Sequence, residues 1–95
     1  MPAVGALTIE LHLDQARSLK DKRHVVKSLK ERLRRRHNIA IAEIGYQDLW
    51  QSALLCAVTV SSSRQLAEQV LEDVERHISA EVGRMLTSAT IEWLE

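Results

Sequence analysis

Between residues 17 and 36 the sequence concentrates its cations: ten of the 13 basic residues lie here, against two acidic ones. At about 100° per residue of an α-helix, five of these side chains fall within an arc of about 80°. They are Lys20, Arg23, Lys27, Lys30 and Arg34, and we call them the basic ridge. At 1.5 Å per residue the ridge would be about 21 Å long, enough to follow several phosphates along the groove edge of a nucleic acid.

Two interpretations of the basic ridge are open. Like charges at helical spacing repel one another and weaken a helix, so the ridge is explained if it binds a polyanion such as structured RNA. Phosphate contacts of this kind carry little sequence discrimination. Alternatively, the ridge is an ordinary solvated helix face, neutralised by the rest of the chain, which has three basic and 11 acidic residues.

A second unusual feature is the segment between two apolar runs, which reads EIGYQDLWQSALL over residues 43–55. A turn is expected here, yet turns favour Gly, Pro, Asn and Ser over the neighbours Leu49 and Trp50. We expect Asp48 to cap a single helical turn that orients both side chains. Trp50 is then expected to fold back and close one end of the core; the alternative is an exposed Leu49–Trp50 anchor for a partner.

Residue types that support catalysis or metal binding form no recognisable motif. The four histidines are expected on separate elements without metal-ligand spacing. They are His12, His24, His37 and His77. The segment DQARS after the first strand has no glycine to form a phosphate-binding loop, no nucleophile elbow is visible, and Cys56 is expected to point into the core. We therefore expect no catalytic residue, no metal or other cofactor, and no small-molecule substrate.

Composition places the chain among ordinary globular domains. It has 95 residues, 45% hydrophobic and 27% charged, which suits a single domain spanning 1–95. A single cysteine is compatible with a reducing compartment. No apolar run has the length of a membrane span and the N-terminus lacks a signal-peptide pattern, so we expect a cytoplasmic protein that does not enter a membrane.

Hydrophobic periodicity predicts six elements in the order βαββαβ. The expected strands are residues 4–13, 38–45, 52–61 and 84–94, and the expected helices are 19–36 and a second one that begins near Ser62 and Gln65 and ends before Gly83. Ser18 and Asp21 have the spacing of a capping box at the start of the first helix. This order predicts an α+β fold of the ferredoxin-like type, a four-stranded antiparallel sheet with two helices on one face.

The inward-facing residues can be predicted from the same periods. In the strands we expect Leu7, Ile9, Leu11, Leu13, Leu54, Cys56, Val58 and Val60, and in the second helix Leu66, Val70, Val74 and Ile78. The open face of the central strands is then expected to carry Thr8, Glu10, His12, Leu55, Ala57 and Thr59. Because it lacks aromatic residues, we do not expect RNA bases to stack on this face.

Two residues break the patterns. Lys22 lies within the apolar stripe of the first helix, where its stem is expected to pack while the ammonium reaches solvent; the alternative is a pair with Glu43. Ile44 is out of phase with Ile39 and Ile41. Either a bulge near Ala42 and Glu43 returns it to the core, or it lies on the open face.

The strand at 38–45 is expected at a sheet edge and is nearly all apolar. Such an edge, or the open sheet face, favours a homodimer about a twofold axis. The alternative is a monomer in which the bulge and the Trp50 loop shield the edge.

Two separated motifs resemble the YlxP-like family, a bacterial domain of unknown function: SLKDKRHVVKSLKERLRRR and AEIGYQDLWQSA. The matching positions are Ser18, Leu19, Lys20, Lys22, Arg23, Val25, Val26, Ser28, Leu29, Ala42, Glu43, Gly45, Gln47, Asp48, Leu49, Trp50 and Gln51. The resemblance covers nearly the whole chain and implies a ferredoxin-like fold. Because members are often encoded near translation and ribosome-maturation factors, it also implies, by association only, an RNA-linked role. It identifies no catalytic residue.

The sequence thus predicts a non-enzymatic module that binds structured RNA on a ribosome or its precursor through the basic ridge. The alternative is a protein-interaction or homodimeric structural domain that does not bind nucleic acid.

Overall fold

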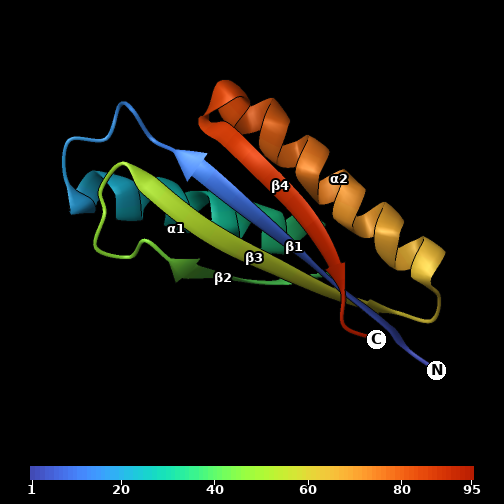
Figure 1. Ribbon diagram of the computed structural model, residues 1–95. Helices are drawn as coiled ribbons and strands as arrows, with labels where there is room; N and C mark the ends of the chain where they lie inside the picture. Colours follow the sequence, from blue (N-terminus) through green and yellow to red (C-terminus); the bar gives the residue numbers. More distant parts are fainter.

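The computed structural model describes residues 1–95 and has the predicted order of elements (Figure 1). The strands are β1 (Ala3–His12), β2 (Ala40–Gly45), β3 (Ser52–Ser61) and β4 (Leu86–Trp93); the helices are α1 (Leu19–Arg36) and α2 (Arg64–Val82), and the short 3₁₀ helix η1 (Gly83–Met85) precedes β4.

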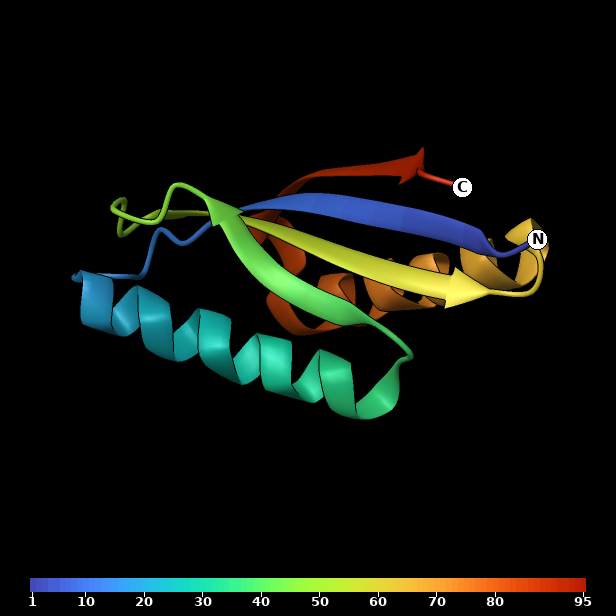
Figure 2. The same cartoon turned by 90° about the horizontal axis from the view of Figure 1, so that it is seen from below.

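The four strands form one antiparallel sheet in the order β2-β3-β1-β4. Both helices lie on the same side of this sheet, and its other face is left open (Figure 2). This arrangement confirms the predicted ferredoxin-like fold. It also confirms that β2 is an edge strand, with one row of backbone groups that has no partner in the sheet.

Ser18 caps α1 as predicted, but the return hydrogen bond of a capping box comes from the residue before the cap, Arg17, and not from Ser18 itself. The hydroxyl of Ser18 accepts a hydrogen bond from the Asp21 N–H at 3.1 Å, and the Asp21 carboxylate accepts one from the Arg17 N–H at 3.0 Å. Helix α2 is capped by Ser63, which accepts from the Leu66 N–H at 3.2 Å, so the predicted cap at Ser62 is wrong by one residue. Neither helix is long and apolar enough to cross a membrane.

The inward face of α2 also differs from the prediction. Val74 and Ile78 are buried as expected, but Ala67 and Leu71 fill the first two turns of the stripe. Leu66 is exposed, and Val70 is only partly buried at the margin of the core. A stripe of strict four-residue spacing drifts around a helix of 3.6 residues per turn. In the observed stripe the step from Leu71 to Val74 is three residues, which keeps the buried side chains on one side of the helix.

The inward face of β1 is as predicted, with Leu7, Ile9, Leu11 and Leu13 all buried. They pack over a core to which α1 contributes Val26, Leu29 and Leu33.

The prediction for β3 is wrong by one residue. Leu55 is paired with Ile9 and Ala57 with Leu7, and paired residues of an antiparallel sheet share a face. The side chains that face the helices are therefore Ala53, Leu55, Ala57 and Thr59, which are all buried. Leu54, Cys56, Val58 and Val60 lie on the open face instead. Both faces of β3 are apolar, and the smaller residues lie inside, where the helices pack on the sheet.

A bulge in β2 places Ile44 outside the core. Glu43 is paired with Leu55 and Gly45 with Leu54, so Ile44 is the extra residue. Its side chain is 53% exposed. The bulge therefore occurs next to the predicted position, but the alternative placement of Ile44 on the open face is the correct one.

Candidate functional site

The basic ridge lies along one flank of α1, beside the buried stripe of Val26, Leu29 and Leu33. Lys30 is partly buried and the other four side chains of the ridge are exposed. None of the five takes part in a salt bridge; the cations of α1 that do are Lys22 and Arg32. The acidic remainder of the chain therefore does not neutralise the ridge by direct contact.

Arg32 shows in which direction the ridge faces. Its guanidinium Nε donates to both carboxylate oxygens of Glu81 on α2, at 3.0 and 2.8 Å. At 100° per residue, Arg32 lies about 160° around α1 from the centre of the ridge. The ridge thus points away from α2. Helix α1 itself lies beside the edge strand β2 (Figure 2). Helix α2 carries five acidic and two basic residues, so the ridge faces away from an acidic helix.

Lys22 is buried and paired. Its Nζ lies 2.7 Å from Oε2 of Glu43 and donates to the carbonyl of Tyr46 at 2.5 Å. Because Lys22 is 1% exposed, the expected route of its ammonium to solvent is wrong and the alternative pair with Glu43 is confirmed. The carboxylate and the carbonyl together offset the cost of removing the ammonium from water.

The β2–β3 loop is shaped by its backbone. Tyr46 has φ 59°, in the left-handed region, and its carbonyl accepts the Leu49 N–H at 3.0 Å. This hydrogen bond closes a turn, so Asp48 does not cap a helical turn as predicted. Leu49 is 50% exposed and Trp50 46% exposed. The prediction that Trp50 closes the core is therefore wrong.

The end of the core is closed by the β1–α1 connection instead. Leu13 and Ala16 are buried, the Leu13 N–H donates to the Gln51 carbonyl at 2.8 Å, and the Gln51 amide donates to the Ala16 carbonyl at 3.5 Å. Leu13 and Ala16 thus take the place expected of Trp50, which stays at the surface with Leu49.

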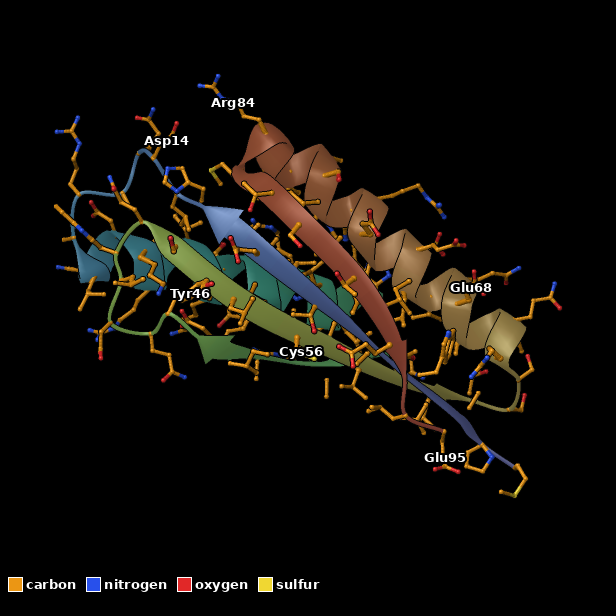
Figure 3. All side chains as sticks on the ribbon, in the orientation of Figure 1. Asp14, Tyr46, Cys56, Glu68, Arg84 and Glu95 are labelled. Carbon is orange, nitrogen blue, oxygen red and sulfur yellow. The ribbon has the colours of Figure 1, made fainter.

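The open sheet face carries an apolar surface that we call the open-face patch. A shallow hollow of about 230 Å³ on β2 and β3 is lined by Ala40, Ile41, Ala42, Ile44, Cys56 and Val58. Figure 3 shows Cys56 in the middle of β3 and Tyr46 near the end of this strand where the β2–β3 loop lies. The Tyr46 hydroxyl donates to Glu10 of β1 at 3.3 Å, which closes this side of the patch with a polar contact. The residues that β3 contributes to this patch were predicted wrongly, because β3 was assigned the opposite phase.

A larger cavity of about 400 Å³ opens beside the first turns of α1. It is lined by Leu13, Gln15, Ala16, Lys20, Asp21, His24, Val25 and Met85, and we call it the α1 pocket. The β1–α1 connection, α1 and η1 each contribute to it. Sequence patterns could not predict it, because Met85 is 60 to 72 residues away from the other lining residues along the chain. Lys20 belongs to both the pocket and the basic ridge.

Two of the four histidines are in contact in the structure, although all four were expected on separate elements without a shared site. Nε2 of His37, at the end of α1, lies 2.9 Å from Nδ1 of His77 on α2, and Nε2 of His77 lies 3.4 Å from Oε1 of Glu81. The two close ring nitrogens share a single proton, so both rings cannot be fully protonated while this hydrogen bond persists. Burial lowers the pKa of His37 from 6.5; the charges of His77 and Arg36 lower it further, and Asp73 opposes them.

Glu81 completes this cluster. The hydrogen bond from Arg32 lowers the pKa of the Glu81 carboxyl, against an opposing effect of burial, and His77 contributes in the same direction as Arg32. The resulting chain of polar contacts joins the C-terminal end of α1 to α2 on the flank opposite the basic ridge.

Comparisons with known proteins agree with the motifs and the fold. The chain is 38% identical over 92 residues to a protein of Bacillus subtilis (strain 168) described as "Uncharacterized protein YlxP", covering 95% of this chain and 98% of the relative. Among solved structures it resembles the de novo designed protein Foldit4, with a TM-score of 0.60, 10% identity, and coverage of 100% of this chain and 98% of that one. A second designed protein, LFR1 1 with ferredoxin fold, matches with a TM-score of 0.50, 18% identity, and coverage of 98% and 83%.

The two structural matches show the fold alone, because their sequences are too different to indicate a shared function. The family is shown by the sequence. Residues 4–91 match the family model described as "Protein of unknown function (DUF503)", and with the relative from Bacillus subtilis this match establishes that the chain belongs to that family.

Proposed function

We propose that this protein is a non-enzymatic, cytoplasmic module that binds structured RNA, on the ribosome or a ribosomal precursor, through the basic ridge of α1. One observation carries the proposal: five cations share one flank of a helix, and none of them has a carboxylate partner within the molecule. Unpaired like charges on one ridge destabilise the helix that bears them. A bound polyanion would remove this repulsion.

The position of the ridge supports the same partner. Because it faces away from the acidic helix α2, an approaching phosphate backbone meets the basic side of the molecule first. Segregated charges of this kind steer association and raise its rate. The ridge reads phosphates and not base edges, so its contribution to affinity is largely independent of sequence.

The proposal predicts steep salt dependence, because each neutralised phosphate releases condensed counterions. Five contacts would give a slope of log K against log salt of roughly −4. We would measure the fluorescence anisotropy of a labelled RNA hairpin with the protein over a series of salt concentrations. The test variant reverses Arg23, Lys27 and Lys30 to Glu, which removes the centre of the ridge.

A charge-matched control reverses three cations outside the ridge, Arg64, Arg76 and Arg84, to Glu. We expect the ridge variant to lose binding while the control retains most of it. The proposal is wrong if the ridge variant retains the RNA, or if both variants lose it equally, since net charge alone would then explain binding. Pulldown from a bacterial lysate at low and high salt, with sequencing of the bound RNA, would identify the natural partner.

A second function is favoured by a different observation, the open-face patch with the exposed Leu49 and Trp50 near one end. This surface suits a homodimer in which a second copy covers the patch, because apolar surface is then removed from water on both copies. Such a dimer would present two basic ridges on one particle, and avidity for a polyanion would increase without any new contact.

A further inference from the structure

The α1 pocket has apolar walls. Leu13 and Ala16 come from the β1–α1 connection, Val25 from the second turn of α1, and Met85 from η1. Its volume of about 400 Å³ lies within the range typical of small-molecule sites, roughly 300–1,000 Å³. A flat apolar ring can enter a cavity of this size.

The polar side chains that line the same cavity are free to bind a ligand. Neither Gln15 nor His24 donates or accepts a side-chain hydrogen bond within the molecule, whereas Asp21 uses one carboxylate oxygen, Oδ2, for the Arg17 N–H. The pocket therefore offers an amide, an imidazole ring and a carboxylate oxygen in addition to its apolar walls. This combination matches a flat heterocycle whose faces are apolar and whose edge is polar.

Lys20 connects this cavity to the ridge, because it lines the pocket and is also the first cation of the ridge. A nucleotide held by its phosphate at Lys20 would carry its base directly beside the opening. Proteins that recognise RNA commonly accept bases that are unstacked from the helix, stack them on aromatic rings that include histidine, and hydrogen-bond their edges.

We propose that the α1 pocket receives one unpaired nucleobase of the RNA whose phosphates lie on the basic ridge. His24 and the apolar walls contact the faces of the base, and Gln15 and Asp21 bind its edge. The inference rests on the proposed function and adds a preference to it: RNA with a bulged nucleotide binds more tightly than fully paired RNA.

The carboxylate of Asp21 makes the preference more specific. A carboxylate accepts hydrogen bonds and does not donate them. Adenine, cytosine and guanine carry an exocyclic amino group that can donate to it, whereas uracil has carbonyl oxygens on both sides of its single N–H. A bulged uridine is therefore the weakest ligand of the four.

The test compares two RNA hairpins that differ only by a single bulged adenosine in the stem, measured by fluorescence anisotropy with the complete protein. We expect the bulged hairpin to bind at least fivefold more tightly, the lower end of the gain from stacking one base on a side chain. His24→Ala and Gln15→Ala should each reduce this ratio, and the double variant should bring it close to one. Affinity for the fully paired hairpin should stay unchanged.

His12→Ala is the matched control, because His12 is also exposed but lies on the open face of the sheet. It should keep the preference for the bulge. Equal binding of both hairpins by the parent protein, or a ratio that survives in the double variant, would overturn the pocket but leave the ridge proposal standing. If neither hairpin binds at low salt, the proposed function fails and the inference fails with it.

Discussion

The ammonium of Lys22 lies 2.7 Å from the carboxylate of Glu43 in the interior of the protein, and this ion pair joins α1 to the edge strand β2. Lys22 also donates to the carbonyl of Tyr46, which has a left-handed backbone. One side chain therefore connects the helix that carries the basic ridge, the bulged strand and the exposed loop that carries Leu49 and Trp50.

Removing one member of this pair should cost much more than removing both. Lys22→Met leaves Glu43 without its partner, and we expect a loss of about 3 kcal/mol, the low end for breaking a buried ion pair. We choose the low end because the Glu43 side chain keeps 18% exposure and water can solvate it in part. The double variant Lys22→Met with Glu43→Leu should be less destabilised than Lys22→Met alone, because no charge is left buried. Urea unfolding of the three proteins measures the difference, and simply additive losses would contradict it.

Gly5 should not tolerate a methyl group. A Cβ at this position would lie 2.8 Å from Cζ3 of Trp93 and 3.0 Å from Cδ1 of Leu71. We expect Gly5→Ala to lower the free energy of unfolding by about 1–3 kcal/mol, the usual cost of overpacking. Trp93→Leu removes the ring, so the added cost of Gly5→Ala should be smaller in that background. The same cost in both backgrounds would show that contact with the Trp93 ring is not its cause.

The stability of the fold should fall as the pH drops below about 6.5. Because the pKa of His37 is lowered in the folded protein, the unfolded chain binds a proton in this window that the folded protein does not bind. The contribution of His37 to the free energy of unfolding is complete above the ordinary pKa of 6.5. It is lost as the pH falls through the lowered pKa of the folded protein. The groups around His37 are His77 and Arg36, which lower its pKa, and Asp73, which raises it.

His37→Gln should therefore flatten the dependence of the unfolding free energy on pH below about 6.5. Glu81 acts in a separate, more acidic window: its lowered pKa stabilises the fold above 4.5, and this contribution is lost at lower pH. Urea unfolding over a pH series separates the two windows. A slope in the His37→Gln protein equal to that of the parent would refute the assignment.

Trp50→Ala should have little effect on stability. Because the side chain is 46% exposed, we expect a loss of about 1 kcal/mol or less, well below the cost of removing a buried aromatic residue. A thermal melt measures this value directly. A loss of 3 kcal/mol would mean that the ring is packed in solution.

Self-association through the open-face patch can be tested separately. If a second copy covers the patch, light scattering at micromolar concentration gives the mass of a dimer, and Ile44→Glu gives a monomer. Leu66→Glu is the matched control, since Leu66 is 48% exposed, close to the 53% of Ile44, but lies on α2. A parent protein that stays monomeric on concentration removes this proposal and leaves the RNA proposal unaffected.

Local patterns along the chain are sufficient to predict the order of the elements, the cap of α1 and the inward face of β1. These features depend on residues close together in the chain: Leu7, Ile9 and Leu11 alternate with polar residues, and Ser18 is three residues from Asp21. One face of β1 is therefore clearly more apolar than the other, and this face can be assigned to the core. The basic ridge follows in the same way, because helical periodicity alone places its five cations on one flank of α1.

Features that depend on contacts between distant residues can be assigned only from the three-dimensional structure. Leu54 and Leu55 are equally apolar, and only the pairing of Leu55 with Ile9 assigns it to the core. Lys22 and Glu43 are 21 residues apart, and the interior position of both became evident only when α1 packed against β2. The α1 pocket and the exposed position of Trp50 likewise depend on distant segments, because the β1–α1 connection, α1 and η1 come together only in the folded protein. Local periodicity is contained in the sequence, whereas the free energy of burying a side chain depends on which distant segments surround it.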